Sequence, residues 1–160
     1  MENKITYQQY KKERQKTFNE LPIFYAFSNE QFNEAMKQRG LDPEKDCDKL
    51  YRTGAGGFYL KSDSQKIQDW VEAGDKLDEL MNDKEFAVSA FYYEMCNHEY
   101  GINYYQGNWD VLSCFYDVEY NDSDDYELYF DELKLNENTR KAYKEARKKY
   151  FADAEANDWF

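Results

Sequence analysis

Apolar side chains recur at helical spacing through most of this 160-residue chain. Between residues 6 and 20 they fall on one face, and Lys, Arg, Glu and Gln occupy most positions between them. A second helix is predicted to begin after Ser28, which has Gln31 three residues later in the pattern of a capping box, and to end at Gly40. The same spacing predicts helices over residues 64–81, 83–100 and 139–157. A loop bracketed by glycines is predicted over residues 101–107, followed by a short helix that starts at Asn108 or Asp110 and ends at Leu112. Residues 83–100 are apolar around much of their circumference, so this helix is predicted to be the most buried.

Short apolar runs of strand length predict a small antiparallel sheet. One run is residues 22–27, and two more lie within residues 51–60 around the turn Gly54-Ala55-Gly56-Gly57. This turn lacks the Gly-Lys-Ser/Thr ending of a phosphate-binding loop, and no helix pattern begins directly after it, so we interpret it as a hairpin turn. The predicted fold is therefore an α-dominated α+β fold with four to five helices, in one compact domain over residues 1–160.

Two patterns compete for the segment that follows Cys114. Residues 115–121 alternate as a strand does, which predicts a hairpin with residues 126–130. Residues 126–133 also have helical spacing behind a cap at Asp124 or Asp125. The sequence leaves both structures open.

The net charge of the chain is confined to one stretch. The chain has 33 acidic and 21 basic residues and a formal net charge of −12. Residues 85–133 contain twelve of the acidic residues, nine of the sixteen tyrosines and no lysine or arginine, so the remaining residues are neutral in sum. A surface of this composition repels nucleic acid and attracts basic partners.

The acidic segment, residues 108–133, carries the densest cluster of carboxylates. Both a solvated loop and a contact face for a Lys/Arg-rich groove explain such a cluster, and the tyrosines beside it favour the contact face, because tyrosine is enriched in interface centres. An EF-hand calcium loop is disfavoured, since residues 121–125 contain no glycine. The predicted partner-binding residues are Asp117, Glu119, Asp122, Asp124, Asp125, Glu127, Asp131 and Glu132, with Tyr116, Tyr120, Tyr126 and Tyr129 as anchors.

The only histidine, His98, lies among potential metal ligands. Thiolate and imidazole suit zinc, so Cys96 and His98 could join Glu94, Cys47 or Cys114 around an ion. Residues two apart on a helix point about 200° away from each other, so Cys96 and His98 can share a metal only if the helix ends there. Glu94 and His98 lie at i, i+4 and would meet, either as a His–carboxylate pair or as two ligands. We interpret them as the pair, with no cofactor required, and keep a structural zinc site at Glu94, Cys96 and His98 as the alternative.

Other features narrow the class of protein. No segment approaches the roughly eighteen apolar residues of a membrane helix, and the first residues lack the apolar core of a signal peptide. Three cysteines without CxxC spacing predict free thiols. These features together predict a cytoplasmic protein. No third member of a Cys–His catalytic group is recognisable, so we expect a protein without enzymatic activity.

Three short stretches carry a resemblance. At residues 21–32 (LPIFYAFSNEQF), 56–60 (GGFYL) and 97–100 (NHEY) the chain resembles a family of small uncharacterised proteins of Firmicutes phages and integrative elements, to which no activity is attached. Small acidic proteins of such elements are similar in size and charge to inhibitors of host defence, including anti-CRISPR proteins that occupy the basic channels of a Cas nuclease or lock its lobes. The resemblance implies an inhibitor that acts in the host bacterial cytosol and binds a basic nucleic-acid enzyme such as a Cas nuclease, but not nucleic acid or membrane. The alternatives are a zinc-containing metalloprotein, structural or catalytic, and an accessory factor of phage replication.

Overall fold

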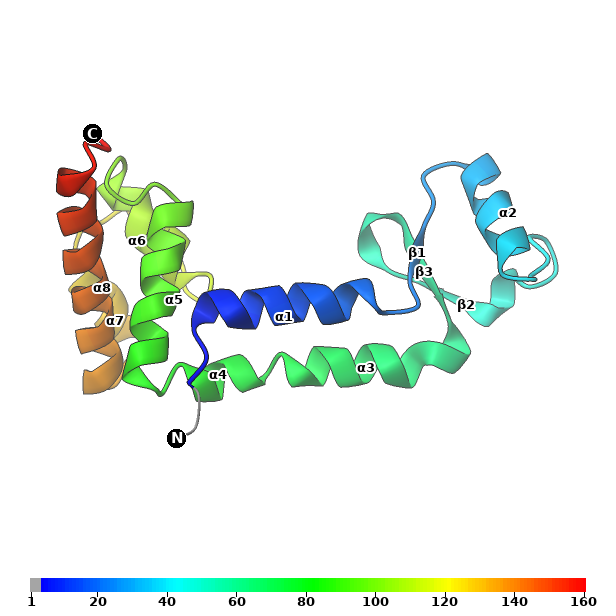
Figure 1. Cartoon of the computed structure of the whole chain (residues 1–160), viewed down its shortest axis with the longest axis horizontal. Coiled ribbons are helices and arrows are strands. Elements are labelled where there is room, and N and C mark those ends of the chain that lie inside the picture. Colours follow the sequence, from blue (N-terminus) through cyan, green and yellow to red (C-terminus); the bar gives the residue numbers. More distant parts are fainter. Residues whose placement is uncertain (1–3) are drawn as a thin grey trace. The chain divides into compact units, whose positions relative to one another are not determined.

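The computed structural model describes residues 4–160, which form two compact units (Figure 1). The first unit comprises the residues up to Glu13 together with Asp75–Phe160, and the second comprises Arg14–Gly74. Helix α1 (Tyr7–Asn19) confirms the first predicted helix and contributes residues to both units. That the whole chain behaves as one domain stays a prediction.

The second unit contains the predicted antiparallel sheet. Its strands β1 (Phe24–Tyr25), β2 (Leu50–Arg52) and β3 (Gly57–Leu60) lie in the order β1-β3-β2, as the hairpin interpretation of the glycine turn requires. Phe24 is the register partner of Phe58, and their rings stack with centroids 5.5 Å apart. Helix α2 (Asn29–Gln38) covers this pair with Phe32, and its predicted cap is confirmed, because the Ser28 side chain accepts a hydrogen bond from the backbone N–H of Gln31.

Helix α3 (Ser64–Ala73) packs against α1 within the second unit through one tryptophan. The guanidinium of Arg14 lies 3.6 Å from the centroid of the Trp70 ring, and its Nη1 donates a 2.6 Å hydrogen bond to the Trp70 carbonyl. The Trp70 indole N–H donates to the hydroxyl of Thr17. Arginine therefore satisfies the tryptophan's carbonyl and covers its ring at once.

The single helix predicted over residues 64–81 is wrong. The chain forms α3 and a separate short helix, α4 (Lys76–Leu80), with Gly74 as the C-cap of α3. Glycine has low helix propensity, and a Cβ at this position would lie 2.8 Å from Nη2 of Arg14. The apolar spacing continues through the break, which is why periodicity alone did not reveal it.

The first unit is a helical bundle around an aromatic core. Helix α5 (Lys84–Asn97), capped by Asp83, packs against the long C-terminal helix α8 (Glu137–Ala156). The central position predicted for residues 83–100 is confirmed, because Phe86, Ala87, Ala90, Phe91 and Met95 are all buried. The core continues with Tyr100, Val111, Leu112, Tyr129, Phe130, Ala142, Tyr143, Ala146 and Tyr150.

Helix α6 (Tyr104–Leu112) begins inside the predicted loop over 101–107, which is a second correction. The side chain of Asn103 caps it by accepting the N–H of Gln106. Gly107 lies within this helix because its missing side chain makes room for Tyr100, whose Cδ2 would lie 3.0 Å from a Cβ there. The glycine therefore serves close packing rather than a turn.

The two structures left open after Cys114 are now distinguished. Residues 126–132 form helix α7 (Tyr126–Glu132), and the Asp125 side chain caps it by accepting the N–H of Glu127. Residues 117–121 are irregular, so the hairpin alternative is wrong. The α-dominated α+β class is confirmed, with more helices among residues 4–160 than the four to five predicted. Within that range no helix has the length and apolar character needed to span a membrane.

Candidate functional site

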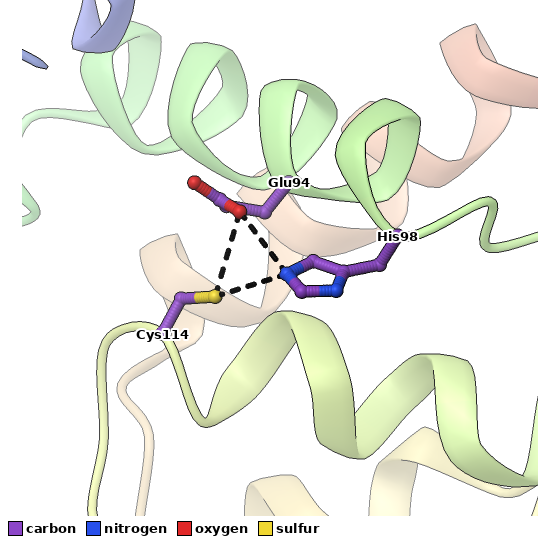
Figure 2. Close-up of side chains that lie close together, drawn as sticks. All are labelled: Glu94, His98 and Cys114. Carbon is purple, nitrogen blue, oxygen red and sulfur yellow. Dashed lines mark hydrogen bonds and ion pairs between the residues drawn. The ribbon is translucent and has the colours of Figure 1, made fainter.

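Three potential metal ligands come together where α5 and α6 end (Figure 2). Nε2 of His98 lies 3.3 Å from Oε2 of Glu94, and Sγ of Cys114 lies 3.5 Å from the same carboxylate oxygen. The Cys114 sulfur and the His98 nitrogen are 3.6 Å apart. Glu94 lies in the last turn of α5 and His98 is the C-cap of that helix, whereas Cys114 follows α6 by two residues. The three atoms thus form a nearly equilateral triangle.

The Glu94 carboxylate is the buried centre of this group, with 2% of its side chain exposed. Its Oε1 accepts hydrogen bonds from the hydroxyl of Tyr7 at 2.8 Å and from Nζ of Lys11 at 3.2 Å, and its Oε2 accepts from Nδ2 of Asn97 at 3.2 Å. Burial by itself would raise the pKa of Glu94, but the hydrogen bonds from Tyr7 and Lys11 outweigh it and the pKa is lowered. The site therefore holds an ionised carboxylate in a fixed orientation.

Cys114 has the properties of a protonated thiol in this arrangement. Burial of the sulfur, and then the negative charge of Glu94, raise the pKa of Cys114 to about 12. Its Sγ lies within hydrogen-bonding distance of both the Glu94 carboxylate and the Asp110 carbonyl. Since the thiolate is the nucleophilic form of cysteine, this environment disfavours nucleophilic catalysis.

The geometry also differs from that of a catalytic triad. In a triad the carboxylate orients one ring nitrogen of the histidine while the nucleophile contacts the other. Glu94 and Cys114 instead approach the same nitrogen, Nε2 of His98. Convergence of oxygen, nitrogen and sulfur on one point is the pattern of a ligand set rather than of a proton relay.

The sequence predicted part of this site. The Glu94–His98 pair at i, i+4 is confirmed, but the structure does not bring Cys96 to it, because a residue two positions from His98 faces the other side of α5. Cys96 lies with Tyr92 in a groove lined also by Tyr150 and Phe160. Of the cysteines that the zinc hypothesis considered, Cys114 and not Cys96 lies beside Glu94 and His98.

Two residues that contact Glu94 had no signal in the sequence. Tyr7 and Lys11 are 87 and 83 residues away from Glu94 along the chain, and both belong to the first turns of α1. Their spacing of four residues places them on one face of a helix. That spacing is equally consistent with packing against any apolar surface, so it does not identify Glu94 as their partner. Only tertiary structure identifies the carboxylate that they contact.

The predicted carboxylates of the acidic segment are largely solvent-exposed. Seven of its eight predicted carboxylates are exposed, and Glu127 is half-buried. Helix α8 supplies counter-charges that lie outside the segment in the sequence: Arg140 pairs with Asp131 at 2.8 Å, and Lys144 pairs with Glu127. The negative charge of the segment is therefore partly neutralised in the folded protein, although the segment itself contains no lysine or arginine.

Other carboxylates of the segment have local structural roles. Asp125 caps α7, and Asp122 accepts a hydrogen bond from the hydroxyl of Tyr120. The remaining four have neither an ion pair nor a side-chain hydrogen bond within the described part of the chain. These four free acids are Asp117, Glu119, Asp124 and Glu132.

The predicted tyrosine anchors divide between core and surface. Tyr129 is fully buried, so its prediction as a partner-binding anchor is wrong. Tyr126 packs on Phe130 and Tyr143, and Tyr116 is half-buried against the core. Tyr120 is 49% exposed. The strand-like alternation of the segment thus reflected contacts with the core as well as surface positions.

Side chains of the core hold the irregular part of the segment in place. Nδ2 of Asn108 donates a 3.0 Å hydrogen bond to the Asp124 carbonyl, and the Trp109 indole N–H donates a 2.9 Å bond to the Val118 carbonyl. The N–H of Asn121 donates to the hydroxyl of the buried Tyr129. The carboxylates are therefore displayed on a backbone with a defined conformation.

The fold and these two sites define a small, α-dominated acidic protein with a Glu–His–Cys cluster around a buried carboxylate and a fixed, carboxylate-rich surface. Over residues 6–149 the chain matches the family described as "Family of unknown function (DUF7659)", and it belongs to that family. Comparison with curated proteins and with solved structures gave no match.

Proposed function

We propose that this is a non-enzymatic binding protein that uses the acidic segment to bind a basic protein surface. The observation that carries the proposal is the set of four free acids, Asp117, Glu119, Asp124 and Glu132, exposed on one segment of the chain. Carboxylates without internal partners repel one another, and a Lys/Arg-rich partner relieves that repulsion.

The fixed backbone of the acidic segment supports binding as well as solvation. A surface that is ordered before it meets its partner loses less conformational entropy on binding. The hydrogen bonds from Asn108 and Trp109 supply that order. Exposed apolar side chains in the same segment, Tyr120 at 49% and Leu128 at 51%, offer contacts that can add affinity to the charge attraction.

The partner class follows from the sign of the charge. Carboxylates compete with phosphates for lysine and arginine, so the fitting partner is the basic groove of a nucleic-acid enzyme, and direct binding of nucleic acid is disfavoured. Most specifically, we propose that the protein is encoded by a phage or mobile element and inhibits a Cas nuclease in the bacterial cytosol. An accessory factor of phage replication would use the same surface with a different partner.

The test is capture of a partner from bacterial lysate on immobilised protein, followed by direct binding with the purified partner. The diagnostic variant combines Asp117→Asn, Glu119→Gln, Asp124→Asn and Glu132→Gln, which spares the cap at Asp125 and the ion pairs of Glu127 and Asp131. We expect it to weaken binding by about tenfold or more, since each well-placed charge contributes to the electrostatic complementarity.

A matched control changes the same number of charges in the other unit: Glu20→Gln, Glu34→Gln, Glu44→Gln and Asp48→Asn, all at exposed positions. It should bind as the wild type does. If both variants lose affinity equally, binding depends only on the net charge of the protein. If the diagnostic variant binds as the wild type does, the acidic segment does not contribute to binding.

The proposed inhibition of a Cas nuclease is tested separately, by measuring DNA cleavage. A panel of purified Cas nucleases loaded with guide RNA is assayed for DNA cleavage with increasing protein, and the diagnostic variant is compared with the control variant. If the wild type and the control variant inhibit cleavage and the diagnostic variant does not, the result supports inhibition of a Cas nuclease. A captured partner that is basic but is not a nuclease would support the binding function and contradict the function as a nuclease inhibitor.

A further inference from the structure

We propose that Glu94, His98 and Cys114 bind one zinc ion, through Oε2, Nε2 and Sγ, with a fourth position open to water. The site is built from the end of α5 and the residues after α6, so it does not depend on the acidic segment or on the function proposed for it.

The distances between the three atoms are those of a tetrahedral zinc site. Zinc bound at about 2.0 Å by oxygen and nitrogen and at about 2.3 Å by sulfur separates its ligands by about 3.3 Å for nitrogen and oxygen and about 3.5 Å for each pair with sulfur. The corresponding separations are 3.3 Å between Nε2 and Oε2, 3.5 Å between Oε2 and Sγ, and 3.6 Å between Sγ and Nε2. The three donor atoms are therefore already spaced as the ligands of one zinc ion.

The chemistry of the donors selects the metal. A thiolate and an imidazole favour zinc and other late transition metals, whereas magnesium and calcium take oxygen ligands almost exclusively. Binding converts the Cys114 thiol to a thiolate, so one proton leaves to solvent for each zinc ion bound. The ion also places a positive charge between the sulfur and the Glu94 carboxylate, whose Oε2 lies 3.5 Å from Sγ.

The outer contacts orient the carboxylate as metal sites require. Tyr7 and Lys11 hold Oε1, which leaves Oε2 directed at His98 and Cys114 (Figure 2). Hydrogen-bonded partners of this kind fix ligand geometry and commonly contribute to affinity. Asn97 donates to Oε2 itself and fixes the rotation of the carboxylate.

The solvent side of the site provides the fourth position. The side chain of His98 is 34% exposed, and Cys114 is an exposed residue, whereas Glu94 closes the site from the interior. Three protein ligands with one position open to water is an arrangement found in zinc sites that exchange ligands.

The test uses the full chain, stripped of metal with a chelator and titrated with zinc in competition with a chromophoric indicator. We expect one zinc ion per chain. With cobalt in place of zinc, a thiolate-to-metal charge-transfer band and the intense visible bands of tetrahedral cobalt should appear. Zinc well below one equivalent, or cobalt without the charge-transfer band, would overturn the proposal.

Two ligand variants and one control decide the identity of the ligands. Loss of an outer-shell partner costs about 10–100-fold in metal affinity, so Cys114→Ser and His98→Gln should each weaken zinc binding by at least that much. Both positions are exposed, so if one variant fails to fold, the other carries the test. Cys96→Ser, on the opposite side of α5, should bind as the wild type does. Wild-type affinity in both ligand variants, or loss in the Cys96 control, would assign the zinc to other residues.

Discussion

The hydroxyl of Tyr7 donates a 2.8 Å hydrogen bond to Oε1 of Glu94, joining the first turn of α1 to the carboxylate buried on α5. Buried charges persist in folded proteins when hydrogen bonds and opposite charges compensate their desolvation. Lys11, one turn further along α1, supplies the opposite charge at 3.2 Å. The start of α1 therefore has a specific polar contact with α5, within the first unit, in addition to its aromatic packing.

Removing the Tyr7 hydroxyl is predicted to destabilise the protein. Tyr7→Phe keeps the ring and its edge-on contacts with Phe86 and Phe115 but leaves the buried carboxylate with one donor fewer. The expected loss in the free energy of unfolding is about 1–3 kcal/mol, measured by chemical denaturation. The control is Tyr93→Phe, whose hydroxyl has no hydrogen-bond partner among residues 4–160 and whose loss should change stability by less than about 0.5 kcal/mol. Equal effects would show that the Glu94 contact adds nothing specific.

Asn108 is predicted to be the most sensitive polar residue of the first unit. Its Oδ1 accepts hydrogen bonds from the hydroxyls of Tyr100 at 2.6 Å and Tyr143 at 2.7 Å, and its amide donates to the Asp124 carbonyl. Asn108→Leu removes the shared acceptor of the two buried hydroxyls and the donor to the Asp124 carbonyl, so we expect a loss of about 2–4 kcal/mol. Hydrogen exchange over residues 117–125 should also become faster.

The exposed neighbour Gln106 provides the control for this prediction. Gln106→Ala lies on the same helix and should leave both the stability and the hydrogen exchange near wild-type values. If Asn108→Leu slowed exchange or left it unchanged, the acidic segment would owe its conformation to other contacts.

The second unit should depend on the contact between Arg14 and Trp70. Arg14→Gln removes both the cation from the Trp70 ring and the donor to its carbonyl, and the expected loss is about 1–2 kcal/mol in the unfolding of this unit, followed by tryptophan fluorescence. Lys16→Gln, an exposed change on the same helix, should have little effect. Similar losses in both variants would point to general electrostatics of α1 instead.

The cap of α5 gives the stability a defined pH dependence. The pKa of Asp83 is lowered, first by the hydrogen bond from the N–H of Phe86 and then by Lys4. A lowered pKa in the folded state means that the charged side chain contributes stability above its unfolded pKa, near 4, and loses that contribution as the pH falls through the folded value.

Two substitutions separate the charge of Asp83 from its capping oxygen. Asp83→Asn keeps a capping oxygen, so its deficit relative to the wild type should be present at neutral pH and vanish in acid. Asp83→Ala loses the cap at neutral pH, at a cost of about 1 kcal/mol. Equilibrium unfolding from neutral pH to about pH 3 measures both, and a constant deficit for Asp83→Asn would contradict the assigned pKa direction.

The sequence predicted the features that local spacing determines. The helices around Tyr7, Phe32 and Phe91 followed from apolar periodicity, and the cap at Ser28 followed from its spacing to Gln31. The fold class followed from the helix patterns and the three apolar runs. These features arise within single elements, where the period of side chains decides which face is buried.

The features that the sequence did not predict depend on tertiary contacts. The break at Gly74 coincides with a contact to Arg14, 60 residues earlier in the numbering. The position of Cys114 beside Glu94 and His98 and the ion pair of Arg140 with Asp131 depend on how helices pack, which periodicity does not encode. Tyr129 was misassigned because interface tyrosines and core tyrosines have the same local pattern.

The binding proposed for the four free acids of the segment depends on charge and therefore on salt concentration. The most direct measurement is the dissociation constant of the purified partner against salt concentration, for the wild type and for the variant with all four acids neutralised. Charge-driven binding predicts that wild-type affinity falls steeply with salt, that the variant binds more weakly at low salt with a shallower slope, and that the two converge at high salt. Superimposable curves for the two proteins would contradict it.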